Sequence, residues 1–492
     1  MNVPFFYRDR AGKCPFLETK LKIEPMDIKS LTRRVPALHR ILRACYRRVS
    51  GRLIGDKIDD LTHRLDRIER ILSNERKHAL GADSTAFVMQ HALASLRDRQ
   101  TERPDAIAVV SILPPDKSGI AHFSLESFSA AGYPVDIYSP RLGLANYLEL
   151  SARMEQNGGL HRVLPLELLS YGLSTLDYSA CIFVLGNSDH NLAIYRAFRQ
   201  WGQLAKLPII HLHDPCLWNL VLAERPKDDI GLILRDTYPE LALPPGVIGV
   251  GEALDIGALG ARVLLGQYAR HGVIVNSEAA YQLLSRELSG ASIRTVFHPI
   301  FQQPVRHNSR NFNKSGPLRI GSFGIPDMEK CTETVLSAFS KLRSRRPDAE
   351  LLLVGYGAPA YLRSLGFGPE QGVFASEPED NDELVEIMSS CHVAVQLRRR
   401  NLGESSGVMA QLMCTRTPVV AFDIGAFGDY RGAVRLIPRE STDTQIADAI
   451  IQEYEVAPSR NDTMAKLIEE RSPFRFCDAF RSAIADLSRV AV

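Results

Sequence analysis

The sequence predicts an α/β protein with two doubly wound, Rossmann-like domains in tandem, preceded by a helical extension. Short β-branched runs that end in Gly, Asn, Ser or Asp alternate with helical patterns, as in parallel sheets covered by helices. The alternation stops at 302–317, which is rich in Asn, Ser and Pro, and then begins again. We therefore predict domains at 104–301 and 318–470 joined by this linker, an extension at 1–103 and a final helix within 471–492.

The composition excludes several classes of protein. Of the 492 residues, 45% are hydrophobic and 24% are charged, which is typical of a folded chain with a sizeable core. The formal net charge is +2, so no overall field favours a nucleic acid. No apolar run approaches the roughly 20 residues that span a bilayer, and the N-terminus lacks the apolar core of a secretory signal. We expect a cytoplasmic protein.

Neither the cysteines nor the histidines are spaced as metal ligands. The eight cysteines form no close pair, and several lie within apolar runs, where a reduced and buried thiol is the ordinary interpretation. No cluster of His, Cys and carboxylate residues has ligand spacing. We therefore expect neither a metal nor another cofactor.

The extension carries two unusual segments. Seven arginines alternate with apolar residues in 32–53, which favours a basic amphipathic helix. Such a helix would either contact anionic lipid on the inner face of the membrane or expose a solvated face. Apolar residues in 54–72 recur in steps of four and three for about three heptads, so this segment would either self-associate or pack its seam on the main body.

Both domains contain strand candidates in the same alternating order. Those of the first domain are 106–113, 134–139, 180–187, 208–214 and 272–277. Those of the second are 318–324, 350–357, 372–376, 393–398 and 418–423. Ligands of open α/β sheets bind at the carboxyl ends of the strands, so two such domains predict a cleft between two sheet edges.

A glycine loop follows the first strand of the second domain. In GSFGIPDMEK (321–330), two glycines let backbone N–H groups approach an anion, and Lys330 adds a full positive charge near a helix start. The same pattern also describes an ordinary strand-to-helix junction, and its spacing matches neither a Walker loop nor a dinucleotide fingerprint. The loop is therefore a candidate phosphate site.

Polar residues precede an apolar helix in GESSGVMAQLMC (403–414). One interpretation is that Ser405 or Ser406 caps the helix. The other is that Glu404 accepts hydrogen bonds from the hydroxyls of a bound polyol, while N–H groups after Gly407 face a phosphate. Glu404 and Lys330 both follow strands of one sheet, so we expect them to share one wall of the cleft.

Four segments of the chain carry a family resemblance. They are LPPDKSGIAHFS (113–124), the pair LGNSDHN (185–191) and HLHDPCL (211–217), FGIPDMEK (323–330) and LRRRNLGESSG (397–407). In this order they resemble the first glycine loop, the cleft histidine segments, the diphosphate loop and the donor-sugar motif of retaining glycosyltransferases with two Rossmann-like domains, the type B fold. That large family includes bacterial enzymes of cell-wall, capsule and lipopolysaccharide synthesis, and the resemblance covers most of 103–429.

The resemblance implies which residues bind the donor diphosphate. Lys330 would neutralise the nucleotide diphosphate as its bond to the sugar breaks. Ser406 and Gly407 would bring backbone N–H groups to the same group, next to the loop glycine Gly324. Many relatives carry an Arg where this chain has Gly324, so Arg398 of the donor motif is our candidate for the second phosphate cation.

The resemblance also implies contacts to sugar and acceptor. Glu404 would hold hydroxyls of the donor sugar or the ribose, and His213 would contact the sugar near its anomeric carbon, which makes both of them catalytic candidates with Lys330. Gly119 would let the backbone approach donor and acceptor. His190 and Asp214 are candidates for the acceptor side. A second Glu found in some relatives is replaced here by Gln411 or Leu412, so ribose recognition by that carboxylate is missing.

Other polar residues have structural explanations. The D-x-D spacing at 380–382 is used by metal-dependent transferases of another fold, but here it opens a helix and fits capping. His211 lies inside a strand and is expected to pack, and Trp218 is expected to be buried. His190 beside Asp189 is either an acid–base pair or a turn residue.

The leading hypothesis is a metal-independent hexosyltransferase that moves a sugar with retention from a nucleotide diphosphate to a glycan or glycolipid hydroxyl in cell-surface polysaccharide synthesis. One alternative is a noncatalytic scaffold of the same fold, which Gly324 and Gln411 favour and which would bind its partner through the heptad segment. Another is a nucleotide-sugar epimerase, which would release free nucleotide without an acceptor.

Overall fold

The computed structural model describes residues 81–98, 103, 105–116, 118–156, 160–226, 228–243, 245–246, 248–268, 272–301, 316–456 and 460–490. The arginine-rich stretch 32–53 and the heptad segment 54–72 lie outside these residues, so the predictions for them stay predictions. No helix in the described part of the chain is both long and apolar enough to cross a membrane. We call 103–301 the N lobe and 316–456 the C lobe.

The N lobe contains a seven-stranded parallel sheet in the order β3-β2-β1-β4-β5-β6-β7. Its strands are β1 (Ile107–Val110), β2 (Val135–Ser139), β3 (His161–Pro165), β4 (Ala180–Leu185), β5 (Pro208–Leu212), β6 (Gly272–Val275) and β7 (Ile293–Thr295). The five predicted strands are present, whereas β3 and β7 were not predicted. Arg162 on β3 forms a buried ion pair with Asp136 on β2, so β3 lacks the apolar pattern of its neighbours.

The C lobe contains a six-stranded parallel sheet in the order β10-β9-β8-β11-β12-β13. Its strands are β8 (Arg319–Phe323), β9 (Glu350–Val354), β10 (Val373–Ser376), β11 (Val393–Gln396), β12 (Val419–Phe422) and β13 (Arg435–Ile437). Only the three-residue β13 was not predicted. The prediction of two Rossmann-like domains in tandem is therefore confirmed.

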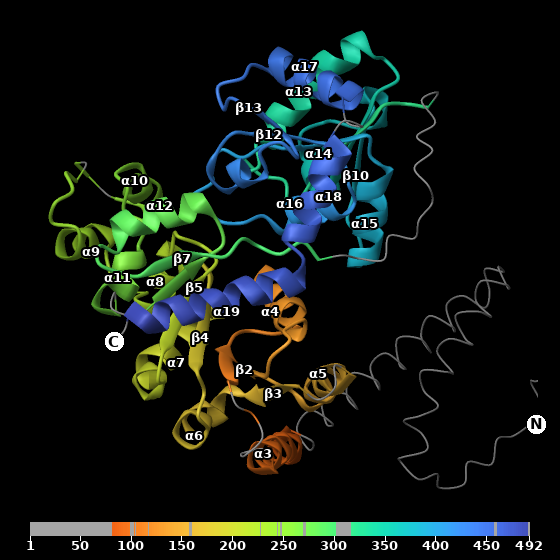
Figure 1. The fold of residues 1–492 in the computed structure, drawn as a ribbon. Coiled ribbons are helices and arrows are strands. Elements are labelled where there is room, and N and C mark those ends of the chain that lie inside the picture. Colours follow the sequence, from red (N-terminus) through yellow and green to blue (C-terminus); the bar gives the residue numbers. More distant parts are fainter. Residues whose placement is uncertain are drawn as a thin grey trace, which may run out of the picture. The chain divides into compact units, whose positions relative to one another are not determined.

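Helices follow most strands and cover the sheets (Figure 1). Before and within the N lobe they are α3 (Gly81–Asp98), α4 (Gly119–Ser129), α5 (Leu144–Gln156), α6 (Leu169–Thr175), α7 (Leu192–Trp201), α8 (Trp218–Glu224), α9 (Ile230–Thr237), α10 (Val250–Asp255), α11 (Ala261–Leu265) and α12 (Glu278–Glu287). In and after the C lobe they are α13 (Thr332–Arg345), α14 (Ala358–Ser364), α15 (Asn381–Ser390), α16 (Gly407–Cys414), α17 (Asp443–Val456), α18 (Asn461–Glu470) and α19 (Pro473–Val490). Short 3-10 turns are η1 (Leu166–Leu168), η2 (Asp189–Asn191), η3 (Gly202–Leu204), η4 (Gly266–Tyr268), η5 (Pro369–Gln371) and η6 (Gly425–Tyr430).

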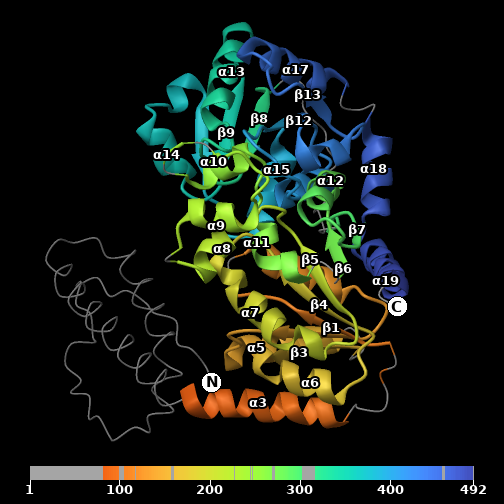
Figure 2. The same ribbon diagram turned by 90° about the vertical axis from the view of Figure 1, so that its left-hand side faces the viewer.

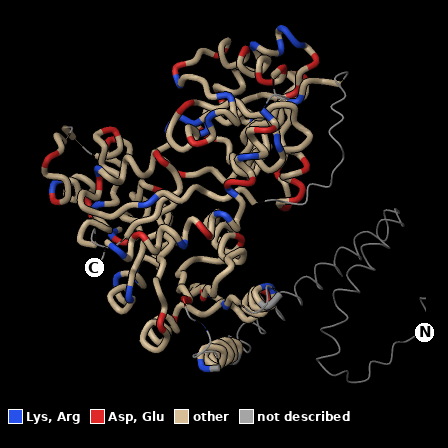
Figure 3. The backbone as a smooth tube through the Cα atoms, in the orientation of Figure 1, with Lys and Arg blue, Asp and Glu red and all other residues tan. Residues whose placement is uncertain are grey.

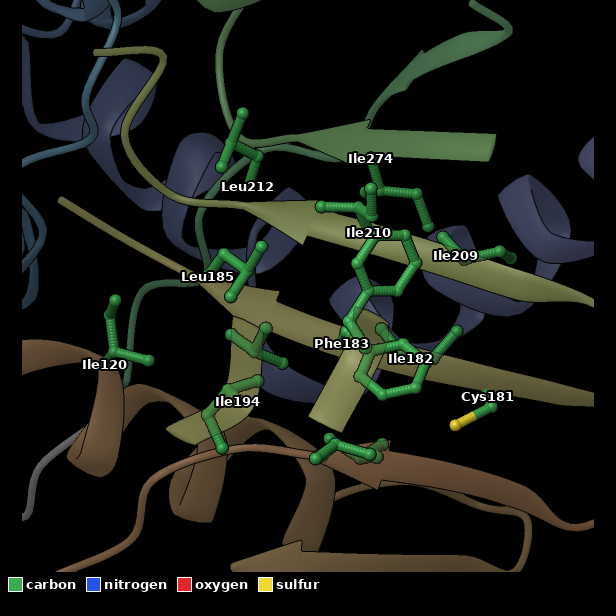
Figure 4. Close-up of a cluster of buried hydrophobic side chains, with 14 of the residues drawn as sticks. Ile120, Cys181, Ile182, Phe183, Leu185, Ile194, Ile209, Ile210, Leu212 and Ile274 are labelled. Atoms are coloured by element: carbon green, nitrogen blue, oxygen red, sulfur yellow. The ribbon is translucent and has the colours of Figure 1, made fainter. Parts of the chain in front are cut away.

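The central strands are continuously apolar because helices bury both faces of the sheet. Figure 4 shows Phe183 of β4 and Ile210 of β5 in one cluster with Ile274 of β6 and Ile194 of α7. All four side chains are 0% exposed. Removing such apolar surface from water contributes about 25 cal/mol per Å², and this burial is the main contribution that stabilises the layer.

The last helix, α19, packs against the N lobe. Figure 2 shows it beside β6 and β7. Tyr133 Oη donates to the Cys477 carbonyl at 3.2 Å. Leu487 approaches β6 so closely that a Cβ at Gly272 would lie 2.6 Å from its Cδ1. The chain therefore returns from the C lobe to the N lobe before it ends.

Candidate functional site

Both sheets reverse their strand order at one point, and the loops at these points form the candidate site. In the C lobe the reversal lies between β8 and β11, and in the N lobe between β1 and β4. Loops that leave a sheet at such a switch run to opposite faces and open a crevice between them. The C-lobe loops carry Lys330 and Glu404, and the N-lobe loops carry Asp116 and His190. Figure 3 shows that basic and acidic residues are interspersed along the described chain, so any charge preference of the site is local.

The loop after β8 holds Lys330 against Gly324. Asp327 Oδ1 accepts a hydrogen bond from the Lys330 backbone N–H at 2.6 Å, which closes the turn before α13. Gly324 has φ of 114°, and a Cβ at this position would lie 3.6 Å from Lys330 Nζ. Desolvation and the positive charge of Arg398 lower the pKa of Lys330 to about 8. The ammonium therefore keeps its charge at neutral pH but loses it in mildly alkaline solution.

The loop after β11, residues 398–407, brings a cation and a carboxylate together. Arg398 Nη1 lies 3.9 Å from Glu404 Oε1, and the guanidinium stacks over Phe427 with its Cζ 5.8 Å from the ring centre. Arg398 Nε is buried and has no hydrogen-bond partner among the described residues. Burial raises the pKa of Glu404, and the charge of Arg398 opposes this shift. Glu404 in turn raises the pKa of Lys330, which places all three groups in one electrostatic cluster.

Asn401 is the internal support of the 398–407 loop, and the sequence analysis missed it. Its Oδ1 accepts from the backbone N–H groups of Gly403 (2.9 Å) and Ala426 (3.0 Å), and its Nδ2 donates to the Glu404 carbonyl (3.3 Å). Glu404 Oε2 also accepts from the Leu402 N–H at 2.7 Å. These bonds fix both the backbone and the carboxylate of Glu404. An Asn three residues before a Glu gives no sequence signal for this role.

The helix that follows the loop begins with a cap. Ser406 Oγ accepts from the Met409 N–H at 3.3 Å, so the capping interpretation is confirmed for Ser406. A Cβ at Gly407 would have nothing within 4 Å, so the backbone at the helix start is open to close approach. Ser405 donates its hydroxyl to the Asn276 carbonyl instead.

Asp214 brings an N-lobe carboxylate to the same cluster. It follows β5, and its Oδ2 accepts from the Asn187 N–H at 2.7 Å. Burial raises the pKa of Asp214, and the charge of Arg398 in the C lobe lowers it. Asp214 also raises the pKa of Glu404. A Cβ at Gly186 would lie 2.8 Å from Asp214 Oδ2, so glycine is needed there for the carboxylate to fit.

His213 lies among aromatic rings next to the cluster. Its ring centre is 4.3 Å from that of Phe123 and 4.6 Å from that of His211. His213 Nε2 is buried without a hydrogen-bond partner among the described residues. Desolvation lowers the pKa of His213 well below its ordinary value, so the ring is neutral at neutral pH.

His190 pairs with Asp116 of a neighbouring loop, rather than with Asp189 beside it in sequence. The distance from His190 Nδ1 to Asp116 Oδ1 is 2.6 Å. Gly119 begins α4, which Ser118 caps by accepting from the Ile120 N–H at 3.3 Å. The pair therefore joins the two loops at the switch point of the N lobe.

The residues with structural explanations behave as expected. Asp380 Oδ1 accepts from the Glu383 N–H at 2.9 Å and so caps α15, which confirms the capping interpretation of 380–382. His211 and Trp218 are both 0% exposed, and Trp218 Nε1 donates to the Ala258 carbonyl. None of the six cysteines in the described part of the chain forms a disulfide. Gln411 Nε2 donates to Asn381 Oδ1 at 2.6 Å, which ties α16 to α15.

The structure thus brings Lys330, Arg398, Glu404 and Asp214 into one cluster, and Ser406 and Gly407 follow Glu404 along the chain at the start of α16. Gly324 adjoins Lys330. His213 adjoins Asp214 in sequence but packs into a ring cluster. His190 and Gly119 belong to the N-lobe loops. The cluster can bind an anion through its two cations and hydroxyl groups through its carboxylates.

Comparisons with known proteins bear on the sequence of the C lobe and on the fold. Residues 318–455 match the family model described as glycosyl transferases group 1. No curated protein sequence matches the chain. Among solved structures, the Anabaena protein HepE in complex with UDP-glucose is 14% identical with a TM-score of 0.50, over 78% of this chain and 99% of that chain.

Two others are trehalose 6-phosphate synthase from Burkholderia multivorans and sucrose-phosphate synthase from Thermosynechococcus elongatus. The first is 11% identical with a TM-score of 0.49, over 79% of this chain and 98% of that chain. The second is 15% identical with a TM-score of 0.46, over 79% and 96%. The match to HepE shows that the chain shares the fold of that protein, and the C lobe matches the group 1 glycosyltransferase family.

Proposed function

We propose that this protein is a glycosyltransferase that moves a sugar, with retention, from a nucleotide diphosphate to a hydroxyl group. The observation that carries the proposal is the cluster of Lys330, Arg398 and Glu404 at the switch point of a lobe whose sequence matches group 1 glycosyltransferases. HepE, which shares the fold, was solved with UDP-glucose. UDP-sugars are therefore the first donors to test.

The cluster would act mainly on the leaving group. The bond between sugar C1 and the diphosphate oxygen breaks, and both electrons go to the diphosphate. Lys330, Arg398 and the N–H groups after Gly407 would stabilise this new negative charge, and prepositioned donors of this kind are usually the largest catalytic term. Two side-chain cations supply the positive charge that a metal supplies elsewhere, which supports a metal-independent reaction.

The remaining residues would place the sugar and the acceptor. Glu404 would accept hydrogen bonds from hydroxyls of the donor sugar or the ribose, and His213 would lie beside the sugar. The acceptor oxygen bonds to C1 on the face that the diphosphate leaves, and its proton passes to the departing phosphate oxygen. His190, Asp214 and the backbone at Gly119 would hold the acceptor, which we propose is a glycan or glycolipid of cell-surface polysaccharide synthesis.

A panel of donors tests this function. The protein is incubated with UDP- and GDP-sugars and a mixture of glycan and lipid-linked acceptors, and the products are identified by mass spectrometry. We expect one donor to be consumed with transfer of its sugar, in the presence of EDTA, and the anomeric proton coupling of the product to match that of the donor. If no nucleotide sugar is consumed, the scaffold is favoured, and nucleotide release without any acceptor would favour the epimerase.

Membrane attachment is a separate proposal that rests on the sequence of 32–53 alone. An engaged Lys or Arg near an anionic leaflet contributes about 1 kcal/mol. Sedimentation with vesicles that contain phosphatidylserine compares the full chain with a chain that lacks residues 1–80. We expect only the full chain to sediment, and equally poor binding by both would refute the proposal.

A further inference from the structure

Asn276, the residue after β6, contacts groups of both lobes. It is 2% exposed. Its side-chain Oδ1 lies 2.7 Å from His211 Nε2, and its Nδ2 lies 3.2 Å from His213 Nδ1. Its backbone carbonyl accepts a hydrogen bond from Ser405 Oγ at 3.2 Å. One residue therefore joins the end of β5 to the loop that carries Glu404.

A single amide between two imidazoles restricts where each ring carries its proton. A neutral imidazole has one donor and one acceptor nitrogen, and a side-chain amide offers an acceptor at one end and donors at the other. With Oδ1 toward His211, that ring donates through Nε2–H. With Nδ2 toward His213, that ring accepts at Nδ1 and must carry its proton on Nε2.

The surroundings keep both rings neutral. His211 and His213 lie among Phe123, Phe476 and a third histidine, His298. Desolvation lowers the pKa of His211 to about 4 and that of His213 well below its ordinary value, and the neighbouring histidines add to the shift of His213. Both rings are therefore limited to the neutral tautomers.

The orientation of the amide also decides which N–H is left without a partner. The opposite orientation would leave the His211 Nδ1–H unpaired inside the sheet, where the residue is 0% exposed. The observed one leaves the N–H without a partner on His213 Nε2, as judged from the part of the chain that the structure describes, and His213 is a half-buried residue at the strand end beside Asp214. An unpaired buried donor is costly, so the observed orientation places this donor at the end of β5 rather than inside the sheet.

Ser277, the residue after Asn276, also contacts the 398–407 loop. Ser277 Oγ donates to the Gly403 carbonyl at 2.6 Å, and it also accepts from the Ala280 N–H to cap α12. Gly403 has φ of 99°, and a Cβ there would lie 2.4 Å from the Ala280 nitrogen. The 398–407 loop is therefore seated directly on the start of α12.

We propose that Asn276 is a positioning residue that holds His213 in its Nε2–H tautomer and fixes the end of β5, with Asp214, against the loop that carries Glu404. Its effect on turnover rests on the proposed function. The tautomer of His213 does not, because it is a property of the free protein.

Histidine ¹⁵N chemical shifts of the ligand-free protein at pH 7 test the first part. The His213 signals are identified by their loss in His213→Gln. We expect an unprotonated Nδ1 and a protonated Nε2 in the wild type. In Asn276→Asp the carboxylate accepts at both ends, so we expect the His213 proton to move to Nδ1 or a second proton to bind there. The exposed Asn381→Asp substitution should leave the spectrum unchanged. A wild-type His213 protonated on Nδ1 would overturn the proposal, whether or not Asn276→Asp folds.

Titration of UDP and GDP into the full chain by calorimetry tests the second part. Ser405→Ala removes the hydrogen bond to the Asn276 carbonyl but leaves the histidines alone. We expect its affinity for the bound nucleotide to fall about three- to tenfold, as for one lost hydrogen bond, with the His213 tautomer unchanged. Ser344→Ala, an exposed hydroxyl on α13, should bind as the wild type does.

The outcomes distinguish failure of the proposed function from failure of the positioning role of Asn276. If the wild type binds neither nucleotide, the proposed function fails while the tautomer result stands. If the wild type binds a nucleotide and Ser405→Ala and Asn276→Ala bind it equally well, the positioning role of Asn276 is wrong.

Discussion

The two lobes share a parallel-sheet architecture but differ in the charged groups that follow their strands. The C lobe contributes two cations, Lys330 and Arg398, beside Glu404, while Asp327 closes the turn that holds Lys330. Loops of the N lobe present two carboxylates, Asp116 and Asp214, with His190. Both sheets are parallel and reverse their strand order once, so this difference in charged groups comes from the residues after the strands. One scaffold can therefore bind an anion on one side and hydroxyl groups on the other.

The largest expected effect tests the cationic side of the comparison. Lys330→Ala and Glu404→Ala should each lower kcat roughly 10²- to 10³-fold, because each removes a prepositioned group from the developing charge or the sugar. Steady-state rates with the donor identified by the panel provide the measurement. Asp382→Ala, on the exposed start of α15, is the matched control and should change the rate little. If Lys330→Ala and Glu404→Ala react at the wild-type rate, the assignment of these two residues to the active site is wrong.

A second prediction concerns the contact that joins the lobes at the 398–407 loop. Gly403→Ala introduces a Cβ that would meet the Ala280 backbone at 2.4 Å, in addition to the strain of a left-handed φ. We expect it to lower the free energy of unfolding by about 2 to 3 kcal/mol. Gly290→Ala, which has φ of 90° but nothing within 4 Å, should cost about 1 kcal/mol. Equal denaturant midpoints for the two variants would show that the loop is not seated on α12.

The third prediction uses the pH dependence of the cationic side. The pKa of Lys330 is lowered to about 8, so its positive charge is present below this pH and is lost as the pH rises through it. We expect kcat/KM to fall roughly tenfold per pH unit above this value. In Lys330→Arg the guanidinium stays charged, so the alkaline limb should move out of the accessible range even if the rate is lower. If kcat/KM of Lys330→Arg falls at the same alkaline pH as that of the wild type, Lys330 is not the group whose titration lowers kcat/KM.

The smallest effect belongs to the N-lobe side. Asp116→Asn removes the charge that holds His190, and we expect the acceptor KM to rise about tenfold with the donor KM unchanged, as for one lost charge-assisted hydrogen bond. Kinetics with each substrate varied in turn provide the measurement. A rise in the donor KM instead would break the division of roles between the lobes.

The sequence predicted those features that depend on local pattern. Buried parallel strands are visible as apolar runs, and the capping roles of Ser406 and Asp380 follow from residues three positions apart. Lys330 and Glu404 were found because loops after neighbouring strands must meet at one edge. In contrast, β3 was missed because Arg162 interrupts its apolar pattern, and the pairing of Arg162 with Asp136 of β2 is visible only in the structure.

The supports of the site could not be predicted for a related reason. Asn276 acts on residues more than sixty positions away, and Asp116 lies far from His190 in the sequence. An isolated Asn or Asp gives no periodic signal, since its role depends on which loops the sheet order brings together. The sequence left open whether His190 pairs with the neighbouring Asp189 or is a turn residue, and the structure pairs it with Asp116 instead.

The most direct test of the central claim is calorimetric titration of UDP and GDP into the wild type, Lys330→Ala and Asp116→Asn. We predict that one nucleotide binds the wild type with a stoichiometry of one, that Lys330→Ala weakens this binding at least tenfold, and that Asp116→Asn leaves it unchanged. Binding that is insensitive to Lys330, or that is lost in Asp116→Asn, would contradict the assignment of the diphosphate to the C lobe.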